Sequence, residues 1–393
     1  MSDDSNDSGA DDSGNGGGGD SFSETTTQSW FSRLAGALGG ILIGLILLPL
    51  AGWGLFWNEG RAVQTARSLA EGAGIVRSVA AEQPDPANEG RLVHVSGAVR
   101  SEKPPGDAEL NIAAPPGTLR LLRQVEMYQW QEQTSSETRT KLGGGTETVT
   151  TYSYRRVWHE GLIDSSRFRQ PDGHQNPQPR YASRAFNAPG VMLGGFRLSD
   201  AQVSGLSGGE VFAPPGAGTD GVLFLGANAE APRVGDLRVT WRIIRPEALS
   251  VIGAQIGDGF GRFQTSAGDR LFRMDQGRVP AAAMIQAAQD ENRILTWILR
   301  LVGAVVIFIG WLLILNPLKV LADVIPPLGW VVGVGTGLIA GVLTLILAPT
   351  IIAIAWLVYR PLVGIAILAT GFALAFGLTR LRRTRPALQG KPA

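Results

Sequence analysis

Long stretches of this chain that carry almost no charge constrain its fold more than any other feature. Residues 34–57 contain no charged side chain, and residues 328–378 contain only Arg360. One helical crossing of a bilayer core needs about 20 apolar residues, so the first stretch fits one helix and the second fits two. A further stretch, residues 295–315, contains only Arg300 and fits one helix. Four membrane helices are therefore predicted.

The breaks between these helices are predicted from single residues. Asn316 and Pro317 are expected to end the second helix, and Arg300 lies near enough to the other end to reach lipid head groups. Between the third and fourth helices, Arg360 with Pro361 is a better break than Pro349. A buried unpaired Arg in lipid costs more than a proline kink.

The rest of the chain is polar. Residues 1–29 hold seven acidic residues and no Lys or Arg, whereas residues 58–293 carry 26 basic and 26 acidic side chains. The predicted order is an acidic Gly/Ser tail without fixed structure at 1–29, membrane helix 1 at 30–57, an exoplasmic domain at 58–293, helix 2 at 294–316, helix 3 at 328–358, helix 4 at 361–379 and a basic cytoplasmic tail at 380–393.

The orientation follows from the distribution of Arg residues. The basic cluster after the last helix marks the cytoplasmic face by the positive-inside rule: Arg380, Arg382, Arg383 and Arg385. The large domain is then in the periplasm of a bacterium or the lumen of a eukaryotic organelle. The residues around the first helix favour the opposite orientation, with Arg33 before it and Arg61, Arg67 and Arg77 after it.

The composition excludes several classes of function. A net charge of +1 gives no electrostatic footprint for nucleic acid, and the absence of Cys excludes thiol catalysis, disulfides and iron–sulfur clusters. The three histidines, His94, His159 and His174, do not have the spacing of a known metal motif, and they are interpreted as structural. The segment Gly257 to Gly261 is typical of a hairpin turn, not of a phosphate loop. No cofactor, metal or catalytic residue is predicted.

The middle domain shows the alternation that is typical of strands. Residues 58–80 have helical spacing, and an amphipathic helix beginning after Val279 and Pro280 is expected to continue into the second membrane helix. Strands are expected at 92–99, 119–130, 148–158, 191–198, 222–225, 237–244 and 251–256, with a flexible hairpin tip at 143–145. The predicted class is an α+β membrane protein with a mostly antiparallel β domain.

Glycines recur every fourth residue in two of the membrane helices. In lipid, such stripes let helix backbones approach closely and pack by dispersion. They are candidate sites for helix packing or oligomerisation, within one chain or between two, and generic tolerance of Gly in membrane helices is the alternative. The stripes are Gly36, Gly40 and Gly44 in the first helix and Gly333, Gly337 and Gly341 in the third.

Five aromatic side chains fall on adjacent predicted strands: Tyr128, Trp130, Tyr152, Tyr154 and Trp158. They are a candidate face for a protein partner or for lipid head groups. The structural alternative, which is favoured, is that they form cross-strand pairs and core.

Several segments resemble the LUMA (transmembrane protein 43) family, in the same order and with the same layout of one helix before and three after the domain. The resemblance covers residues 30 to 380. It rests on Arg91 to Gly97 with Ser101 to Pro104, Leu122 to Trp130, Tyr152 to Tyr154 with Trp158, Gly173 to Pro177, Val234 to Val239 and Tyr359 to Leu362.

The resemblance implies a four-helix membrane protein with a luminal or periplasmic domain. It also implies self-association and, in eukaryotes, a place in the endoplasmic reticulum and inner nuclear membrane with lamins and emerin as partners. This chain departs from eukaryotic members in its acidic tail and Arg-rich composition. A bacterial member, in the inner membrane, has no lamina, so the nuclear partners do not carry over.

The function predicted from these features is that of a non-enzymatic membrane scaffold, whose partners are membrane lipids, other copies of itself and other membrane proteins. A sensor whose exoplasmic domain binds a small ligand or lipid is the alternative, favoured by any deep apolar pocket. A membrane-embedded hydrolase or transporter ranks last, because the predicted helices contain no acid or His.

Overall fold

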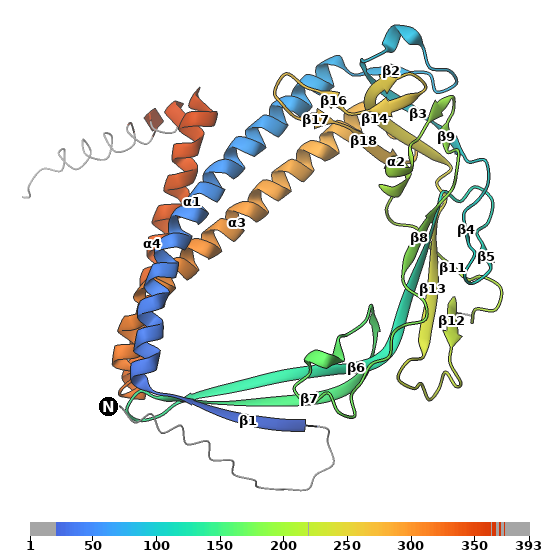
Figure 1. Ribbon diagram of the computed structural model, residues 1–393. Coiled ribbons are helices and arrows are strands. Elements are labelled where there is room, and N and C mark those ends of the chain that lie inside the picture. Colours follow the sequence, from blue (N-terminus) through green and yellow to red (C-terminus); the bar gives the residue numbers. More distant parts are fainter. Residues whose placement is uncertain (1–20, 219, 363, 367–368, 371–372, 374–393) are drawn as a thin grey trace, which may run out of the picture.

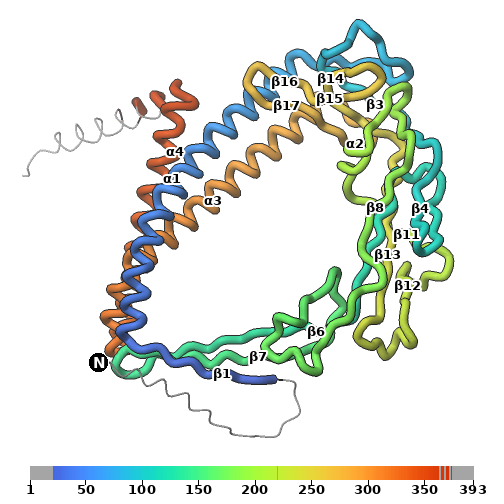
Figure 2. The backbone as a smooth tube through the Cα atoms, viewed as in Figure 1, coloured from blue at the N-terminus to red at the C-terminus, as the bar shows by residue number. Residues whose placement is uncertain are grey.

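The computed structural model of this chain is an open ring, with long helices on one side and a β-rich region on the other (Figure 1). It describes residues 21–218, 220–362, 364–366, 369–370 and 373. The backbone trace shows where the ring closes: a long β-hairpin, residues 120–160, returns to the N-terminal end of the first helix (Figure 2).

Among the described residues, three helices are long and apolar enough to cross a membrane. They are α1 (Trp30–Ile75), α3 (Ala281–Ala322) and α4 (Pro326–Tyr359). Their apolar halves share a core of Ala51 and Leu55 from α1, Ile307 from α3 and Ala348 from α4. The predicted fourth span, 361–379, falls largely outside the described residues, so the structure shows three candidate spans and not four.

Two predicted helix ends are wrong. The first membrane helix does not end at Trp57, because α1 continues unbroken to Ile75 and includes the helix expected within 58–80. Likewise α3 runs through Pro317 to Ala322. A proline frees only the carbonyl four residues earlier, here that of Leu313, and neighbouring helices make this tolerable in a membrane segment. Gly40 of α1 stands beside that carbonyl, with 3.7 Å between the oxygen and the position of an added Cβ.

The break chosen for the third helix is confirmed. α4 passes through Pro349 and ends at Tyr359, where Arg360 caps it by donating its backbone N–H to the carbonyl of Trp356 at 2.8 Å.

The first of two seven-stranded sheets is antiparallel, in the order β1-β7-β6-β13-β11, with β8 on β6 and β12 on β13. Its strands are β1 (Ser21–Gln28), β6 (Arg120–Thr140), β7 (Thr146–Glu160), β8 (Arg184–Asn187), β11 (Glu210–Phe212), β12 (Val222–Leu225) and β13 (Leu237–Ile244). The predicted hairpin is confirmed by the pairing of β6 with β7.

Strand β1 corrects another prediction, because residues 21–28 belong to a sheet and not to a tail without structure. β1 pairs with β7 from Ser21↔Ser153 to Gln28↔Thr146. Three consecutive threonines and Phe22 favour a strand, and the long edge of β7 supplies a partner. Residues 1–20 lie outside the described part.

The second sheet has the order β18-β14-β15-β10-β9-β3-β2, with β14 also on β3. Its strands are β2 (Arg77–Val79), β3 (Leu92–Arg100), β9 (Met192–Leu193), β10 (Phe196–Arg197), β14 (Ala248–Ile256), β15 (Gly259–Gly261) and β18 (Arg273–Gln276). β2–β3 and β10–β15 are parallel, and the other pairs are antiparallel. The predicted turn between Gly257 and Gly261 is confirmed as the β14–β15 connection.

The minor elements are β4 (Gly106–Asp107) paired with β5 (Ile112–Ala113), β16 (Phe263–Gln264) paired with β17 (Arg270–Leu271), and the short helix α2 (Asp200–Ser204).

The helices are joined to the second sheet by a shared core. Leu69 of α1, Leu92 of β3, Ile252 of β14, and Met284 and Ile285 of α3 form one buried cluster. As a result, the C-terminal part of α1 and the N-terminal part of α3 pack against the second sheet, and these contacts fix the separation of the two helices.

Candidate functional site

Two ion pairs bound the apolar part of the helices. Arg33, near the start of α1, pairs with Asp323, just after α3, and Glu59 of α1 pairs with Arg300 of α3 at the other end. Between them α1 has 25 uncharged residues (34–58) and α3 has 18 (301–318). At 1.5 Å per residue these are about 38 Å and 27 Å, and a bilayer core is about 30 Å thick. The ion pairs therefore lie at the two ends of the apolar helix segments, about one bilayer core apart.

Exposed tryptophans stand at the same two levels. Trp330 is near the Arg33 end and is 71% exposed, while Trp57 and Trp297 are near the Glu59 end and are 51% and 63% exposed. Tryptophan prefers the interface between lipid and water, so the aromatic positions agree with the charged ones.

The pair at the domain end joins all three helices. Arg300 donates from Nε and Nη2 to the two carboxylate oxygens of Glu59, at 2.7 and 2.9 Å, and Trp356 of α4 donates its Nε1–H to Oε2 at 2.8 Å. Trp297 and Trp356 lie under the guanidinium, with ring centroids 4.7 and 5.7 Å from its carbon. Glu59 is 1% exposed. The carboxylate thus accepts three hydrogen bonds from two partners, Arg300 and Trp356, and a buried charge requires such bonds.

This arrangement corrects two predictions. Arg300 does not simply extend toward the lipid head groups, because its guanidinium group forms an ion pair with Glu59. A buried acid also does lie on a membrane helix. Glu59 lies two residues past the predicted end of the first helix. The helical spacing of residues 58–80 could have indicated that Glu59 lies on the same helix. Its pairing with Arg300, 241 residues away, had no signal in the sequence.

A second polar network lies one turn closer to the domain. Arg61 donates to the amide oxygen of Asn292 at 2.9 Å, to that of Asn58 at 3.2 Å and to the hydroxyl of Thr296 at 3.1 Å. Asn58 and Asn292 donate in turn to the carbonyls of Thr296 and Ala62. The partners of Arg61 are all neutral, and its Nε atom is buried without a hydrogen bond.

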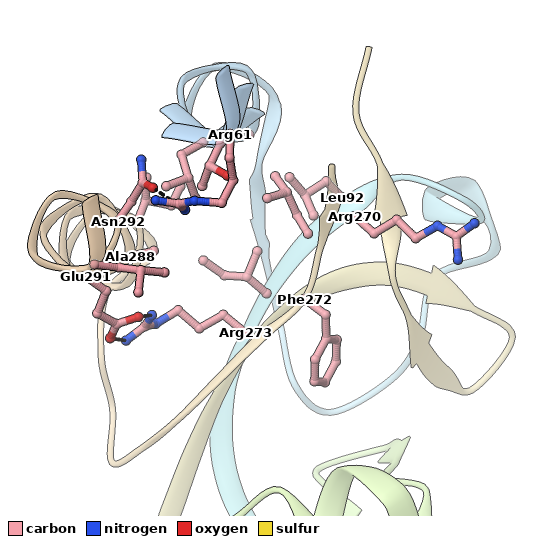
Figure 3. A pocket seen from close by; sticks show the side chains of 15 residues that line it. Arg61, Leu92, Arg270, Phe272, Arg273, Ala288, Glu291 and Asn292 are labelled. Atoms are coloured by element: carbon pink, nitrogen blue, oxygen red, sulfur yellow. Dashed lines mark hydrogen bonds and ion pairs between the residues drawn. The ribbon is translucent and has the colours of Figure 1, made fainter. Parts of the chain in front are cut away.

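Above this network, a cavity of about 340 Å³ lies between α1, α3 and the second sheet (Figure 3). Its walls are apolar, and polar groups gather at its edges. Figure 3 shows Arg61 and Asn292 facing each other between the helices, Arg273 paired with Glu291, and Arg270 pointing away. The hydrogen bond from Arg273 to Glu291 raises the pKa of Arg273 from its ordinary value. The volume falls within the range of ligand pockets in proteins.

Another cavity, of about 380 Å³, opens beside the Glu59–Arg300 pair. Three arginines on α3 and at the end of α4 line it: Arg293, Arg300 and Arg360. Gln289 and the rings of Trp297 and Trp356 also line it, as do Glu59, Ala62, Ala66, Asn292 and Thr296. We call this the basic interfacial cavity.

The two glycine stripes have different surroundings. In α1, a Cβ on Gly44 would stand 2.6 Å from the carbonyl of Gly310 in α3, and one on Gly40 would stand 3.7 Å from Leu313, so both glycines pack within the chain. Gly36 has nothing within 4 Å. The first stripe is therefore largely an internal contact between α1 and α3.

In α4, Gly333 faces the aliphatic part of Lys319, while Gly337 and Gly341 have nothing within 4 Å in the described chain. The residues of α4 that pack inward form a neighbouring stripe of small side chains, which was not predicted from the sequence: Thr336, Ala340, Thr344 and Ala348. A period of four with small residues was the available signal. Gly337 and Gly341 lie beside this stripe on an open face.

The aromatic residues pair across strands. Tyr128 and Trp158 are register partners with ring centroids 5.1 Å apart, and Tyr154 stacks on His174 at 4.0 Å. Burial and its hydrogen bond to Glu132 raise the pKa of Tyr154. Tyr152 stacks on Phe22 of β1, and Trp130 meets His174 edge-on. The Tyr128–Trp158 and Tyr152–Phe22 contacts are cross-strand pairs, whereas Trp130 and Tyr154 contact His174 in a loop.

The segment Gly173 to Pro177 has a structural explanation through Asn176. Its side-chain amide accepts from the N–H of Trp130 at 2.7 Å and donates to the carbonyls of Trp130 and Ile163 at 2.9 and 3.1 Å. The side chain of Asn176 therefore pairs with the backbone of β6 at Trp130, as a neighbouring strand would.

The histidines do not converge. His94 is buried between the Ser78 hydroxyl and the Val279 carbonyl, and no group of metal-ligating side chains occurs among the described residues. The predicted basic cluster, Arg380, Arg382, Arg383 and Arg385, lies outside the described part.

Comparison with known proteins gives consistent matches. The sequence profile of the family described as Transmembrane protein 43 matches residues 127–361. Human Transmembrane protein 43 is 33% identical over 389 residues, covering 89% of this chain and 92% of its own. The mouse protein is 32% identical and covers 85% and 88%, and a Drosophila melanogaster homolog is 28% identical and covers 86% and 94%. No solved structure matches the chain.

Proposed function

The chain belongs to the transmembrane protein 43 family, and from that premise we propose that this membrane protein is a non-enzymatic scaffold that self-associates and gathers lipids and other membrane proteins. The observation that supports self-association best is the open glycine face of α4. Among the described residues, no atom lies within 4 Å of a Cβ added to Gly337 or Gly341, and close helix approach is what such glycines permit. In this proposal the domain supplies binding surfaces for partners.

The test is the native mass of variants in lipid discs formed directly from the membrane. Gly337→Leu places a branched side chain on the open face, and we expect the oligomer to dissociate to smaller species. Gly335→Leu is the matched control, since Gly335 is equally open but lies about 200° around the helix from Gly337. An unchanged native mass for Gly337→Leu, or equal loss in both variants, would reject this face as the interface.

The location follows from the same proposal. A bacterial inner membrane with both chain ends in the cytoplasm and the large domain in the periplasm fits the predicted positive cluster at 380–385, and a fourth helix at 361–379 is part of that topology.

A second candidate function, a sensor for a small apolar ligand, is favoured by the cavity of Figure 3. Ala288 lines that cavity, and an Ala288→Trp variant would fill it. Extraction and mass spectrometry of the purified protein tests this reading. A stoichiometric small molecule present in the wild type and absent from Ala288→Trp supports it, and an empty wild-type protein opposes it.

A further inference from the structure

The basic interfacial cavity lies at a defined depth in the membrane. Its wall includes Glu59 and Arg300, the ion pair that marks the domain-side end of the apolar helices, together with Trp297 and Trp356. Lipid phosphates occupy this level of a bilayer, just outside the hydrocarbon core. The cavity is therefore in contact with head groups wherever the helices cross a membrane.

The charge of the cavity wall is positive. Three arginines, Arg293, Arg300 and Arg360, face one acid, Glu59, which leaves a formal charge of +2. Arg300 is neutralised by Glu59, so the unbalanced charge resides on the other two. Within the described residues Arg293 has one ion pair, at 3.3 Å with Asp290; both side chains are exposed, and such surface pairs contribute little to stability. No ion pair within the described part of the chain includes Arg360.

Neighbouring groups strengthen this preference for an anion. The C-terminal carbonyls of α4 would repel a negative charge, but Arg67 donates to the carbonyl of Tyr359 at 3.2 Å and covers that end. Gln289 adds an amide to the wall. A further cavity shares Arg360 with the basic interfacial cavity. It is lined by Arg67, Val63, Ala70 and Leu362, so apolar surface continues from the arginines.

We propose that the basic interfacial cavity binds the phosphate of an anionic phospholipid, held between the guanidinium groups of Arg293 and Arg360, with an acyl chain along the adjoining apolar wall. Planar guanidinium forks bind phosphate oxygens in pairs, and basic pockets between membrane helices are a known setting for anionic head groups. The ligand would contact α1, α3 and α4 together, because each contributes to the wall.

The experiment uses the full chain reconstituted with equal amounts of phosphatidylglycerol and phosphatidylcholine and released for native mass spectrometry. We expect wild type to retain phosphatidylglycerol preferentially. Arg293→Gln with Arg360→Gln should lower that ratio about tenfold or more, since a hydrogen bond to a charged group contributes at least that factor. Arg360→Gln alone should give an intermediate ratio.

The matched control is Arg197→Gln with Arg245→Gln, which removes two charges with similarly weak ion pairs on the β region. It should leave the ratio unchanged. An unchanged ratio in the cavity variant, an equal fall in the control, or no preference in wild type would each overturn the proposal. Thermal unfolding of each variant in phosphatidylcholine alone, where all should match wild type, shows that they fold.

A last arm separates lipid from free phosphate. Phosphatidylglycerol added to protein in phosphatidylcholine should raise the unfolding temperature, and millimolar inorganic phosphate should not. Equal increases would overturn the assignment to a lipid. The same spectra report oligomer mass, so loss of lipid retention and loss of self-association are distinguished in one measurement.

Discussion

At the scale of single residues, the Glu59–Arg300 pair is the contact whose loss should matter most. Both side chains are largely withdrawn from water, at 1% and 16% exposure, and Trp356 adds a third hydrogen bond. Removing one partner of a buried pair leaves an uncompensated charge, whereas removing both can be nearly neutral. The sequence could indicate that each residue lies near a membrane boundary, but it could not indicate that they meet.

We expect Glu59→Gln to lower the free energy of unfolding by about 3 kcal/mol, because Arg300 is left without its carboxylate at the edge of the lipid. The double variant Glu59→Leu with Arg300→Met should recover most of that loss. Glu137→Gln serves as a control, since the Glu137–Arg139 pair is exposed and should contribute less than about 1 kcal/mol.

Denaturant unfolding in lipid discs measures all three variants. Equal losses for Glu59→Gln and Glu137→Gln would contradict a buried role for the pair.

At the scale of elements, alternation and spacing predicted most strands and the continuation of the domain's last helix into the membrane. β3, β12 and β13 lie where alternating apolar residues placed them. The errors fall where tertiary contacts override local rules. Pro317 does not stop α3, because the helix is supported along its length by α1, and residues 21–28 form a strand because β7 offers an edge.

The packing of α1 on α3 gives the prediction for this scale. Gly44→Leu would drive a side chain into the Gly310 carbonyl, 2.6 Å from the position of a Cβ, and we expect a loss of at least about 2 kcal/mol in stability. Gly36→Leu has open space at the same helix and should be close to neutral. Thermal unfolding in lipid discs compares them, and similar melting temperatures would show that the α1–α3 contact tolerates separation.

At the scale of the whole molecule, the closed ring brings together parts of the chain that the predicted topology places on opposite sides of the membrane. Arg33 donates to the carbonyl of Gly144 at the hairpin tip, and the N–H of Gly143 donates to the carbonyl of Val324 at 3.2 Å. That topology places Arg33 and Val324 on one side of the membrane and residues 58–293 on the other. The outer part of the hairpin is rich in Thr, Ser, Glu and Arg and cannot cross lipid. A flat bilayer around the helices therefore excludes the closed ring.

We expect the ring to open in the membrane, with loss of the β1–β7 pairing of the closed ring, so that the hairpin tip stays with the domain. The chain has no Cys, so single cysteines at Phe31 and Leu142, which are 76% and 87% exposed, can be labelled with an impermeant thiol reagent in intact cells. Labelling at 142 and not at 31 is the expected result. Labelling of both or of neither would mean that the tip remains at the helix end and that the predicted topology is wrong.

The unbroken course of α1 has a mechanical consequence. Residues 59–75 extend about 26 Å beyond the membrane boundary as a stiff continuation of the part in lipid. A change of about 10° in the tilt of the helix, within the range that bilayer thickness imposes on membrane helices, moves the far end by about 4 Å. Since α3 runs alongside and both helices pack on the second sheet through Leu69 and Met284, a tilt of the pair in the bilayer would displace the sheet with it.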